Sequence, residues 1–258
     1  MSLILFSREN QTAVLTLNRP DKFNSFNRDM ALELQGYLDE CAAEEEIRAV
    51  VLTGSGKAFC AGQDLAEATD PQGPPLEQIV SDHYNPIILK IRNLEKPVIA
   101  AVNGVAAGAG ANIALACDIV LAKESASFIQ AFSKIGLIPD SAGTYFLPRL
   151  VGMQRATALM MTGDKLSATE AFQMGMIYRV YPDESFEKET MTLASQLASM
   201  PTRGLALTKK LLNETYQHTL EQQLAREKDL QVQAGNTYDF KEGVAAFLEK
   251  RAPVFKGK

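Results

Sequence analysis

The sequence predicts an α/β fold with a largely parallel sheet, and three observations support that prediction. Short apolar runs rich in β-branched residues, at 49–53 and 98–102, indicate buried strands, and they alternate with segments of helical periodicity. Each of these two strands runs into a turn that contains glycine. Beyond residue 182 the pattern is helical only. We therefore expect strands joined through helices in a parallel core, followed by a helical layer.

The elements before the first turn follow from local patterns. Two β-type runs at 4–6 and 13–17 flank a polar segment and predict a hairpin. Apolar residues recur at helical spacing over 27–41, with Asn27 or Ser25 as the N-cap. A loop rich in Pro and Gly is expected at 67–75, followed by a helix over 76–94 with a kink near Pro86.

The remaining elements are predicted in the same way. Short strands are expected at 119–122, 126–129 and 176–181. Ser167 and Glu170 form a capping box that opens a helix closed by Gly175. Four helices are expected in the C-terminal layer, at 186–200, 204–218, 220–234 and 240–250. We accordingly expect a core over residues 1–195 and a helical region over 196–258.

Composition excludes several classes of protein. The net charge is −5, with 26 basic and 31 acidic residues interspersed, which argues against a nucleic-acid partner. No stretch reaches the roughly 18 apolar residues of a membrane span, and the N-terminus has no leader pattern. Three widely spaced cysteines predict reduced thiols and a cytoplasmic location. With two histidines and no cysteine pair, we expect no metal site.

The two glycine turns are the candidate site. Gly108, Ala109 and Gly110 have no side chain beyond a methyl group, so a ligand could approach the backbone and meet free N–H groups at a helix N-terminus. The segment 54–65, which comes first along the chain, forms another such turn, and the two turns could face each other. The alternative is that the small residues only allow the helix to pack tightly on the strand. The residues alone leave both interpretations open.

Four motifs, in this order, resemble the enoyl-CoA hydratase/isomerase (crotonase) superfamily over essentially the whole chain. They are KAFCAGQDL at 57–65, KPVIAAVNG at 96–104, GAG at 108–110 and ACDI at 116–119. The resemblance implies a spiral of strand-strand-helix units and a helical C-terminal oligomerisation region that forms a homotrimer or a dimer of trimers. It also implies an acyl-CoA substrate, so that coenzyme A is part of the substrate and no separate cofactor is needed.

The resemblance also assigns residues to the site. It makes the backbone N–H groups of Gln63 and Ala109 the donors of an oxyanion hole for the thioester carbonyl. It places coenzyme A along Lys22, Ala61, Asp64 and Leu65, with Phe255 and Lys258 supplied by a neighbouring subunit. Further substrate-binding positions are Gly62, Gly108, Gly110, Asn112 and Phe132. For the lysines, a solvated surface is the simpler alternative. Tyr84 and Tyr145 could line the acyl pocket or belong to the core.

Asp140 is the candidate acid/base residue. Hydratases of the superfamily use two glutamates, and the matching positions here are Asn112 and Phe132, which cannot ionise. Water addition needs a pair of groups that orient and activate water, so we expect weak hydratase activity at most. Superfamily isomerases present a carboxylate from the position of Asp140. Burial by Phe132, Leu137 and Ile138 is expected to raise its pKa. From the residues alone, the simpler role of Asp140 is an N-cap for a helix starting at Ser141.

A closer resemblance selects among these roles. The segments 131–140, 175–177 and 242–258 resemble the 1,2-epoxyphenylacetyl-CoA isomerase branch of the superfamily, from bacterial phenylacetate degradation. This implies isomerisation of the ring epoxide to an oxepin, with Asp140 as the proton shuttle. One alternative is an aliphatic 3-enoyl-CoA to 2-enoyl-CoA isomerase of fatty acid metabolism, or a weak hydratase. Another is a non-catalytic RNA-binding or assembly homologue, against which the lack of a basic stripe counts.

Overall fold

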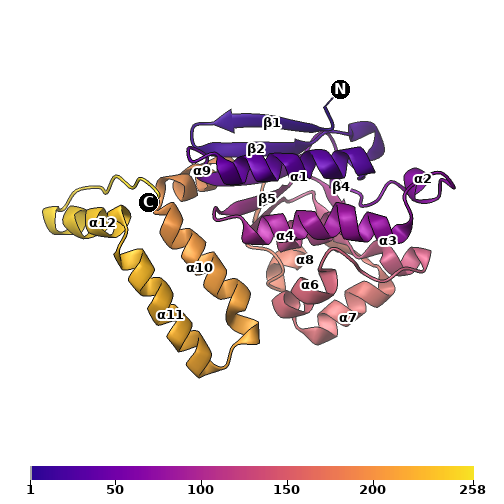
Figure 1. Cartoon of the computed structure of the whole chain (residues 1–258). Coiled ribbons are helices and arrows are strands. Elements are labelled where there is room, and N and C mark those ends of the chain that lie inside the picture. Colours follow the sequence, from indigo (N-terminus) through magenta and orange to yellow (C-terminus); the bar gives the residue numbers. More distant parts are fainter. Residues whose placement is uncertain (1) are drawn as a thin grey trace.

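Two β-sheets form the centre of the chain in the computed structural model, which describes residues 2–258 (Figure 1). The larger sheet has the order β1-β2-β3-β5-β7-β10. Its strands are β1 (Ile4–Glu9), β2 (Thr12–Leu17), β3 (Ala49–Gly54), β5 (Val98–Val102), β7 (Ile119–Lys123) and β10 (Arg179–Tyr181). Only the β1–β2 hairpin pairs antiparallel among them. The predicted hairpin and the parallel core are therefore confirmed.

The smaller sheet has the order β4-β6-β8-β9. Its strands are β4 (Ala58–Cys60), β6 (Val105–Ala107), β8 (Ser127–Ile129) and β9 (Lys165–Ser167). β4, β6 and β8 pair in parallel, and β9 is antiparallel to β8. Along the chain, β3 with β4, β5 with β6 and β7 with β8 each give one strand to each sheet before a helical segment follows. This is the predicted spiral of strand-strand-helix units.

The helices that the sequence predicts are present, and one of them contains an irregular turn. α1 (Arg28–Ala43) is capped by the Asn27 side chain, which accepts a hydrogen bond from the Met30 N–H. The helix predicted for 76–94 is present without a break over 76–93, and its irregularity is a π-helical turn: α3 (Leu76–Gln78) runs into η2 (Ile79–Tyr84) and then into α4 (Asn85–Asn93). Pro86 lies in the first turn of α4 and has no N–H to donate to a carbonyl of the preceding helical turn. The irregularity is the π turn that precedes it.

The other helical segments follow in chain order. They are η1 (Pro20–Lys22), α2 (Leu65–Ala68), α5 (Ala109–Ala116), η3 (Ala131–Ile135), α6 (Gly143–Val151), α7 (Met153–Thr162), α8 (Ala168–Gln173), α9 (Phe186–Ser199), α10 (Thr202–Glu214), η4 (Thr215–Gln217), α11 (Leu220–Gly235) and α12 (Tyr238–Glu249). The capping box of Ser167 and Glu170 at the start of α8 is confirmed. The strand predicted at 176–181 is shorter and covers only β10.

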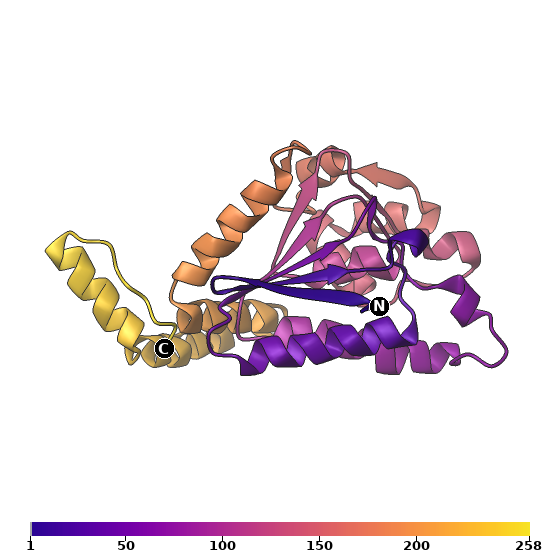
Figure 2. The same ribbon diagram turned by 90° about the horizontal axis from the view of Figure 1, so that it is seen from above.

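The C-terminal helices divide into one that covers the sheet and three that lead away from it. α9 packs on the larger sheet through Phe186 and Ala194, which join a cluster with Ile99 and Leu121. α10, α11 and α12 extend to one side of the core in both views (Figures 1 and 2). The boundary predicted after residue 195 therefore falls inside α9, because this helix belongs to the core it covers.

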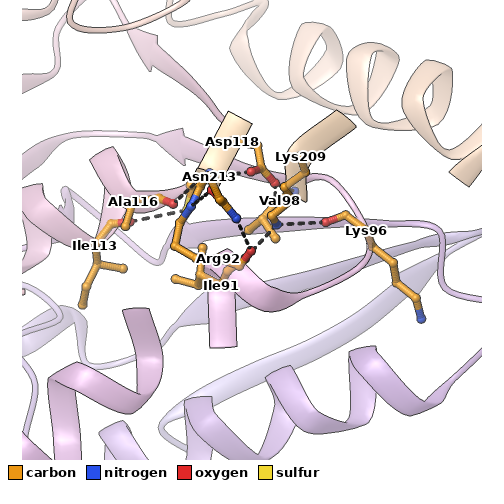
Figure 3. Close-up of polar contacts among 10 residues, drawn as sticks. Ile91, Arg92, Lys96, Val98, Ile113, Ala116, Asp118, Lys209 and Asn213 are labelled. Atoms are coloured by element: carbon orange, nitrogen blue, oxygen red, sulfur yellow. Dashed lines mark hydrogen bonds and ion pairs between the residues drawn. The ribbon is translucent and has the colours of Figure 1, made fainter. Parts of the chain in front are cut away.

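A buried polar cluster fastens α10 to the core (Figure 3). The Lys209 ammonium, on α10, lies 2.8 Å from an Asp118 carboxylate oxygen and donates to the Ile91 carbonyl at 2.7 Å. The other Asp118 oxygen lies 3.1 Å from Arg92, on α4. The carboxylate also accepts from the Val98 N–H at 2.8 Å. One α10 side chain thus bonds to the end of α4 and to the residue that precedes β7.

Replacing Lys209 by Met is expected to lower the free energy of unfolding by about 2 kcal/mol, because buried acceptors lose their donor. The Lys210→Met variant is the matched control, since Lys210 is exposed on the same helix and its loss should change stability by about 0.5 kcal/mol or less. Urea denaturation of both variants measures the difference. Equal stabilities would show that α10 is not held by this cluster.

The three thiols Cys41, Cys60 and Cys117 are free and buried, and burial raises the pKa of each to about 12. They are therefore protonated packing groups. Over residues 2–258, no helix combines the length and apolar character that crossing a membrane requires. Within the same range, no group of three or more His, Cys, Asp or Glu side chains is arranged to hold a metal ion.

Candidate active site

The two glycine turns face each other at the ends of two adjacent strands. β4 and β6 are parallel neighbours, so the turns that follow them leave the same edge of the smaller sheet. Gly62 has a φ of +94° and Gly108 a φ of +53°, conformations that favour glycine. A Cβ atom added to Gly62 would lie 3.0 Å from the Ala107 carbonyl oxygen and 3.5 Å from the Ala109 nitrogen. The predicted meeting of the turns is confirmed.

Backbone hydrogen bonds fix the direction of one N–H group on each turn. The Gly62 carbonyl accepts from the Phe26 N–H at 2.7 Å. Since a trans peptide points its C=O and N–H to opposite sides, the Gln63 N–H points away from Phe26. The Gly108 carbonyl accepts from the Asn112 N–H at 3.2 Å, so the Ala109 N–H points out of the α5 N-terminus. Among residues 2–258, neither N–H has a hydrogen-bond acceptor.

The small residues therefore serve two purposes: they form turns whose backbone a ligand can approach, and they allow the helix to pack tightly on the strand. Gly62 and Gly108 supply the turn conformations, whereas Gly110 serves close packing. A Cβ atom on Gly110 would lie 2.4 Å from the Cys60 carbonyl oxygen, which only glycine avoids. A Cβ atom on Gly108 would lie 3.8 Å from the Phe132 ring, which covers the second turn.

Asp140 lies in the loop before α6, and the predicted role as an N-cap is wrong. α6 starts at Gly143, its N-cap is Ala142, and no side chain caps it. Ser141 and Ala142 both have positive φ values, 49° and 59°, so the helix starts later than the sequence suggests. The Asp140 carboxylate accepts instead from the Ser141 hydroxyl at 2.9 Å. The helix does not engage this carboxylate, which leaves it available for chemistry.

Asn112 holds the Asp140 loop in place. Its amide nitrogen donates to the Asp140 carbonyl at 2.8 Å, and its amide oxygen accepts from Gln130 at 2.8 Å. The side chain is 0% exposed. The prediction that Asn112 contacts substrate is therefore corrected, because a fully buried amide with both ends bonded positions the loop instead. Phe132, at the other position predicted from the hydratases, is also buried.

Burial raises the pKa of the Asp140 carboxyl, and the Ser141 hydrogen bond partly offsets this. The predicted direction of the shift is confirmed. Of the three side chains expected to cause it, Phe132 is buried, Leu137 is 40% exposed, and Ile138 is 83% exposed and points largely to solvent. Tyr84 lies near enough for the charge of Asp140 to contribute, after burial, to a raised pKa of the phenol.

The residues predicted to bind coenzyme A differ in their exposure and in whether their side chains already have hydrogen-bond partners. Lys22, Ala61 and Leu65 are exposed around the first turn. Asp64 is already engaged: it pairs with Arg19 at 2.8 Å and caps α2 by accepting from the Ala66 N–H. Partial burial works against ionisation of Asp64, but these hydrogen bonds outweigh it and lower its pKa. Asp64 therefore shapes the turn through its side chain.

The C-terminal end of the chain lies at the other side of the molecule from α2 (Figure 1). The Phe255 carbonyl accepts from Arg48 at 2.9 Å, and the Lys258 carbonyl accepts from the Asp239 N–H at 3.2 Å. The tail is thus fastened to α12 and the core. It does not reach the active site of its own chain, and its contact with a neighbouring subunit's ligand stays a prediction.

Sequence reasoning did not find the residues that hold the Gln63 side chain. The Tyr84 hydroxyl donates to the Gln63 amide oxygen at 2.8 Å, and the Gln63 amide nitrogen donates to Glu67 at 2.9 Å. The sequence does not decide whether Tyr84 lines the acyl pocket or belongs to the core, and in the structure it is 1% exposed. The π turn that ends at Tyr84 has no signal in the apolar pattern of 76–94.

The arrangement suits a reaction that passes through a thioester enolate. Two free N–H groups at facing turns can accept the oxygen of a thioester enolate, and charge developing there is stabilised by donors already in position. One carboxylate with a raised pKa is a suitable base for a carbon acid. No second ionisable group stands at the positions of Asn112 and Phe132.

Comparisons with known proteins agree with this geometry. A model of the enoyl-CoA hydratase/isomerase family matches residues 7–258. The 1,2-epoxyphenylacetyl-CoA isomerase of Escherichia coli is 48% identical, and the match covers 100% of both chains. A probable enoyl-CoA hydratase of Rhodobacter capsulatus is 47% identical, with 95% of each chain covered. The crystal structure of an enoyl-CoA hydratase from Bacillus anthracis superposes with a TM-score of 0.93 at 36% identity, covering 100% of both chains.

Proposed function

Because this chain belongs to the enoyl-CoA hydratase/isomerase family and is an enzyme, we propose that it is an acyl-CoA isomerase that moves a proton on a thioester enolate. One observation carries the proposal. Asn112 lies on α5, the helix that begins with the unpaired Ala109 N–H, and its amide donates to the Asp140 carbonyl, so the Asp140 loop is fastened to the helix of this turn. Asn112 and Phe132 stand at the positions that resemble the hydratase glutamates, which leaves the Asp140 carboxylate as the acid/base group. A single carboxylate can shuttle a proton, whereas water addition needs two cooperating groups.

In the proposed reaction, the Asp140 carboxylate takes a proton from the carbon beside the thioester carbonyl. The electrons of that C–H bond form the enolate, whose oxygen accepts hydrogen bonds from the Gln63 and Ala109 N–H groups. Each such donor contributes about 3 kcal/mol to transition-state stabilisation. Asp140 then returns the proton to another carbon, so that the product is an isomer of the substrate. No cofactor takes part, because coenzyme A is carried by the substrate.

For the substrate we propose the ring-1,2-epoxide of phenylacetyl-CoA, which the reaction converts to an oxepin thioester in phenylacetate catabolism. There the C–C bond between the two epoxide carbons breaks to give the seven-membered ring, both C–O bonds are kept, and the proton taken beside the carbonyl is returned to a ring carbon. The name and 48% identity of the Escherichia coli relative support this assignment. The same residues could isomerise an aliphatic 3-enoyl-CoA to its 2-enoyl isomer, which is the alternative. The full-length relatives are named as enzymes, which leaves the RNA-binding alternative without support.

We further propose that the chain acts as a homotrimer or a dimer of trimers in the cytoplasm. Large apolar side chains stand exposed on the helices that leave the core, among them Leu220 on α11 and Phe247 and Leu248 on α12. Phe247 and Leu248 line one groove together with Phe240 and Val244. An exposed apolar groove of this kind is typical of protein interfaces. Sedimentation measures the oligomeric state, and a monomer at micromolar concentration would contradict this part of the proposal.

The substrate assignment is tested by assaying the purified enzyme on ring-1,2-epoxyphenylacetyl-CoA, an aliphatic 3-enoyl-CoA and a 2-enoyl-CoA in the same buffer. The proposal expects isomerisation of the ring epoxide with the highest kcat/KM and little hydration of the 2-enoyl thioester. A higher kcat/KM on the aliphatic 3-enoyl-CoA would favour the alternative. Hydration as the fastest reaction would overturn the isomerase proposal.

The raised pKa of Asp140 predicts the pH dependence of activity. The ionised carboxylate is the base, so kcat/KM falls as pH falls through a pKa that lies above the ordinary value of 3.8. The stability effect has the opposite sense. A carboxyl with a raised folded-state pKa favours folding at low pH, and this contribution is lost as pH rises from 3.8 through the raised pKa.

A pH–rate profile of kcat/KM measures the acidic limb, and a urea titration at each pH controls for unfolding. The Asp164→Asn variant, which changes an exposed carboxyl, should show the same acidic limb of kcat/KM as the wild type. A wild-type limb at or below the ordinary carboxyl value would contradict a buried base.

A further inference from the structure

The side chain of Gln63 is held at both ends of its amide. Its oxygen accepts from the Tyr84 hydroxyl at 2.8 Å, and its nitrogen donates to a Glu67 carboxylate oxygen at 2.9 Å. The Glu67 carboxylate also accepts from the Arg28 N–H, at 2.9 and 3.1 Å. The residue that supplies one oxyanion donor is therefore tied through its side chain to η2, to α2 and to the start of α1.

Tyr84 is the buried member of this network. It is 1% exposed and is the last residue of the π-helical turn η2. Its ring packs edge-on against Phe26, with centroids 5.9 Å apart and planes at 73°. Phe26 is also the residue that bonds to both sides of Gln63, through the Gly62 carbonyl and the Asp64 N–H. Tyr84 thus supports the first turn through a hydrogen bond and through the packing of Phe26.

The backbone of this turn needs such support because its neighbour is a glycine. Gly62 adopts a φ of +94° and has no side chain to pack. Rotation of the Gly62–Gln63 peptide would re-aim the Gln63 N–H, and an oxyanion donor acts only when it points at the developing charge. The Phe26 bridge restrains the carbonyl side of this peptide. The hydrogen bonds of the Gln63 side-chain amide to Tyr84 and Glu67 restrain Gln63, the residue on the nitrogen side of this peptide.

We propose that Tyr84 is a positioning residue of the oxyanion hole, which acts through the Gln63 side chain to aim the Gln63 N–H at the thioester oxygen. This inference rests on the proposed function of the site. Tyr84 itself touches no reacting atom in this role. Its hydroxyl matters because it joins a rigid, buried ring to the residue that carries the donor. The π turn matters because it places that hydroxyl opposite the Gln63 amide.

The Tyr84→Phe variant removes the hydroxyl and keeps the ring that packs on Phe26. We expect kcat to fall about tenfold, less than the 10²- to 10³-fold cost of losing an oxyanion donor outright, with KM nearly unchanged. A direct readout is the infrared stretch of the thioester carbonyl of bound phenylacetyl-CoA. Hydrogen bonds from the oxyanion hole lower this frequency, and the variant should show a smaller lowering than the wild type.

A double-mutant cycle separates positioning from packing. If Tyr84 acts through the Gln63 side chain, the Tyr84→Phe change should have little further effect on kcat once Gln63 is Ala. Tyr37→Phe is the matched control, because Tyr37 is half-buried, stacks on Phe6 and makes no side-chain hydrogen bond among the described residues. It should leave both kcat and the carbonyl frequency at wild-type values.

The outcomes distinguish this inference from the proposed function. If the carbonyl frequency of bound phenylacetyl-CoA is not lowered in the wild type, the oxyanion hole itself is wrong. If it is lowered equally in the wild type and in Tyr84→Phe, the hole exists and the role of Tyr84 is overturned. Full additivity of Tyr84→Phe and Gln63→Ala would likewise overturn it.

Discussion

Replacing Asp140 by Asn is expected to lower kcat for isomerisation about 10³-fold, because the amide cannot take the proton from the substrate carbon. The substitution preserves the shape of the side chain and its contact with Ser141. Binding of the acyl-CoA should therefore change little. Stopped-time assays of isomerisation measure kcat, and calorimetry with phenylacetyl-CoA measures binding.

The control for this substitution is Asp164→Asn, at an exposed position after α7, which should keep full activity. Loss of both binding and activity in Asp140→Asn would indicate a damaged loop and would call for a stability measurement. A variant as fast as the wild type would show that another group moves the proton, and the role assigned to Asp140 would be wrong.

Replacing Gly62 by Ala should lower kcat about 100-fold by disturbing the oxyanion hole. The φ of +94° is unfavourable for alanine, and the new methyl group would lie 3.0 Å from the Ala107 carbonyl oxygen and 3.5 Å from the Ala109 nitrogen. Either the two turns separate or the Gln63 peptide rotates. Both responses move a donor away from the thioester oxygen.

Gly36→Ala is the matched control, since a Cβ atom at Gly36 of α1 meets nothing within 4 Å. Alanine there should leave kcat unchanged and raise the stability slightly, because glycine weakens a helix interior. The prediction for Gly62 fails if its alanine variant binds the thioester carbonyl with the same infrared shift as the wild type.

Much of the fold follows from patterns that depend on neighbours in the sequence. The C-terminal helices, the β1–β2 hairpin and the Ser167 capping box are predicted closely, because periodicity, polar breaks and caps are local signals. The π turn η2 is not predicted, because its apolar residues fit an ordinary helix equally well. The last two residues of this turn, His83 and Tyr84, are both 1% exposed, and that burial depends on the rest of the fold.

The part of the site that backbone groups form can be predicted from the sequence. The roles of side chains that depend on unusual backbone conformations or on contacts with distant residues cannot. The facing turns follow from glycines after neighbouring strands. Asp140 does not cap α6 because Ser141 and Ala142 adopt left-handed conformations, for which these residue types give no sign. The burial of Asn112 likewise depends on its contacts with Asp140 and Gln130, which lie far along the chain.

The central claim is that Asp140 removes the proton beside a thioester carbonyl held by the two turns. Exchange of the C2 protons of phenylacetyl-CoA in D₂O, followed by NMR, tests this step without any subsequent rearrangement. We expect the wild type to catalyse the exchange and Asp140→Asn to leave it at the uncatalysed rate while still binding the thioester. Exchange by the variant at the wild-type rate would contradict the account.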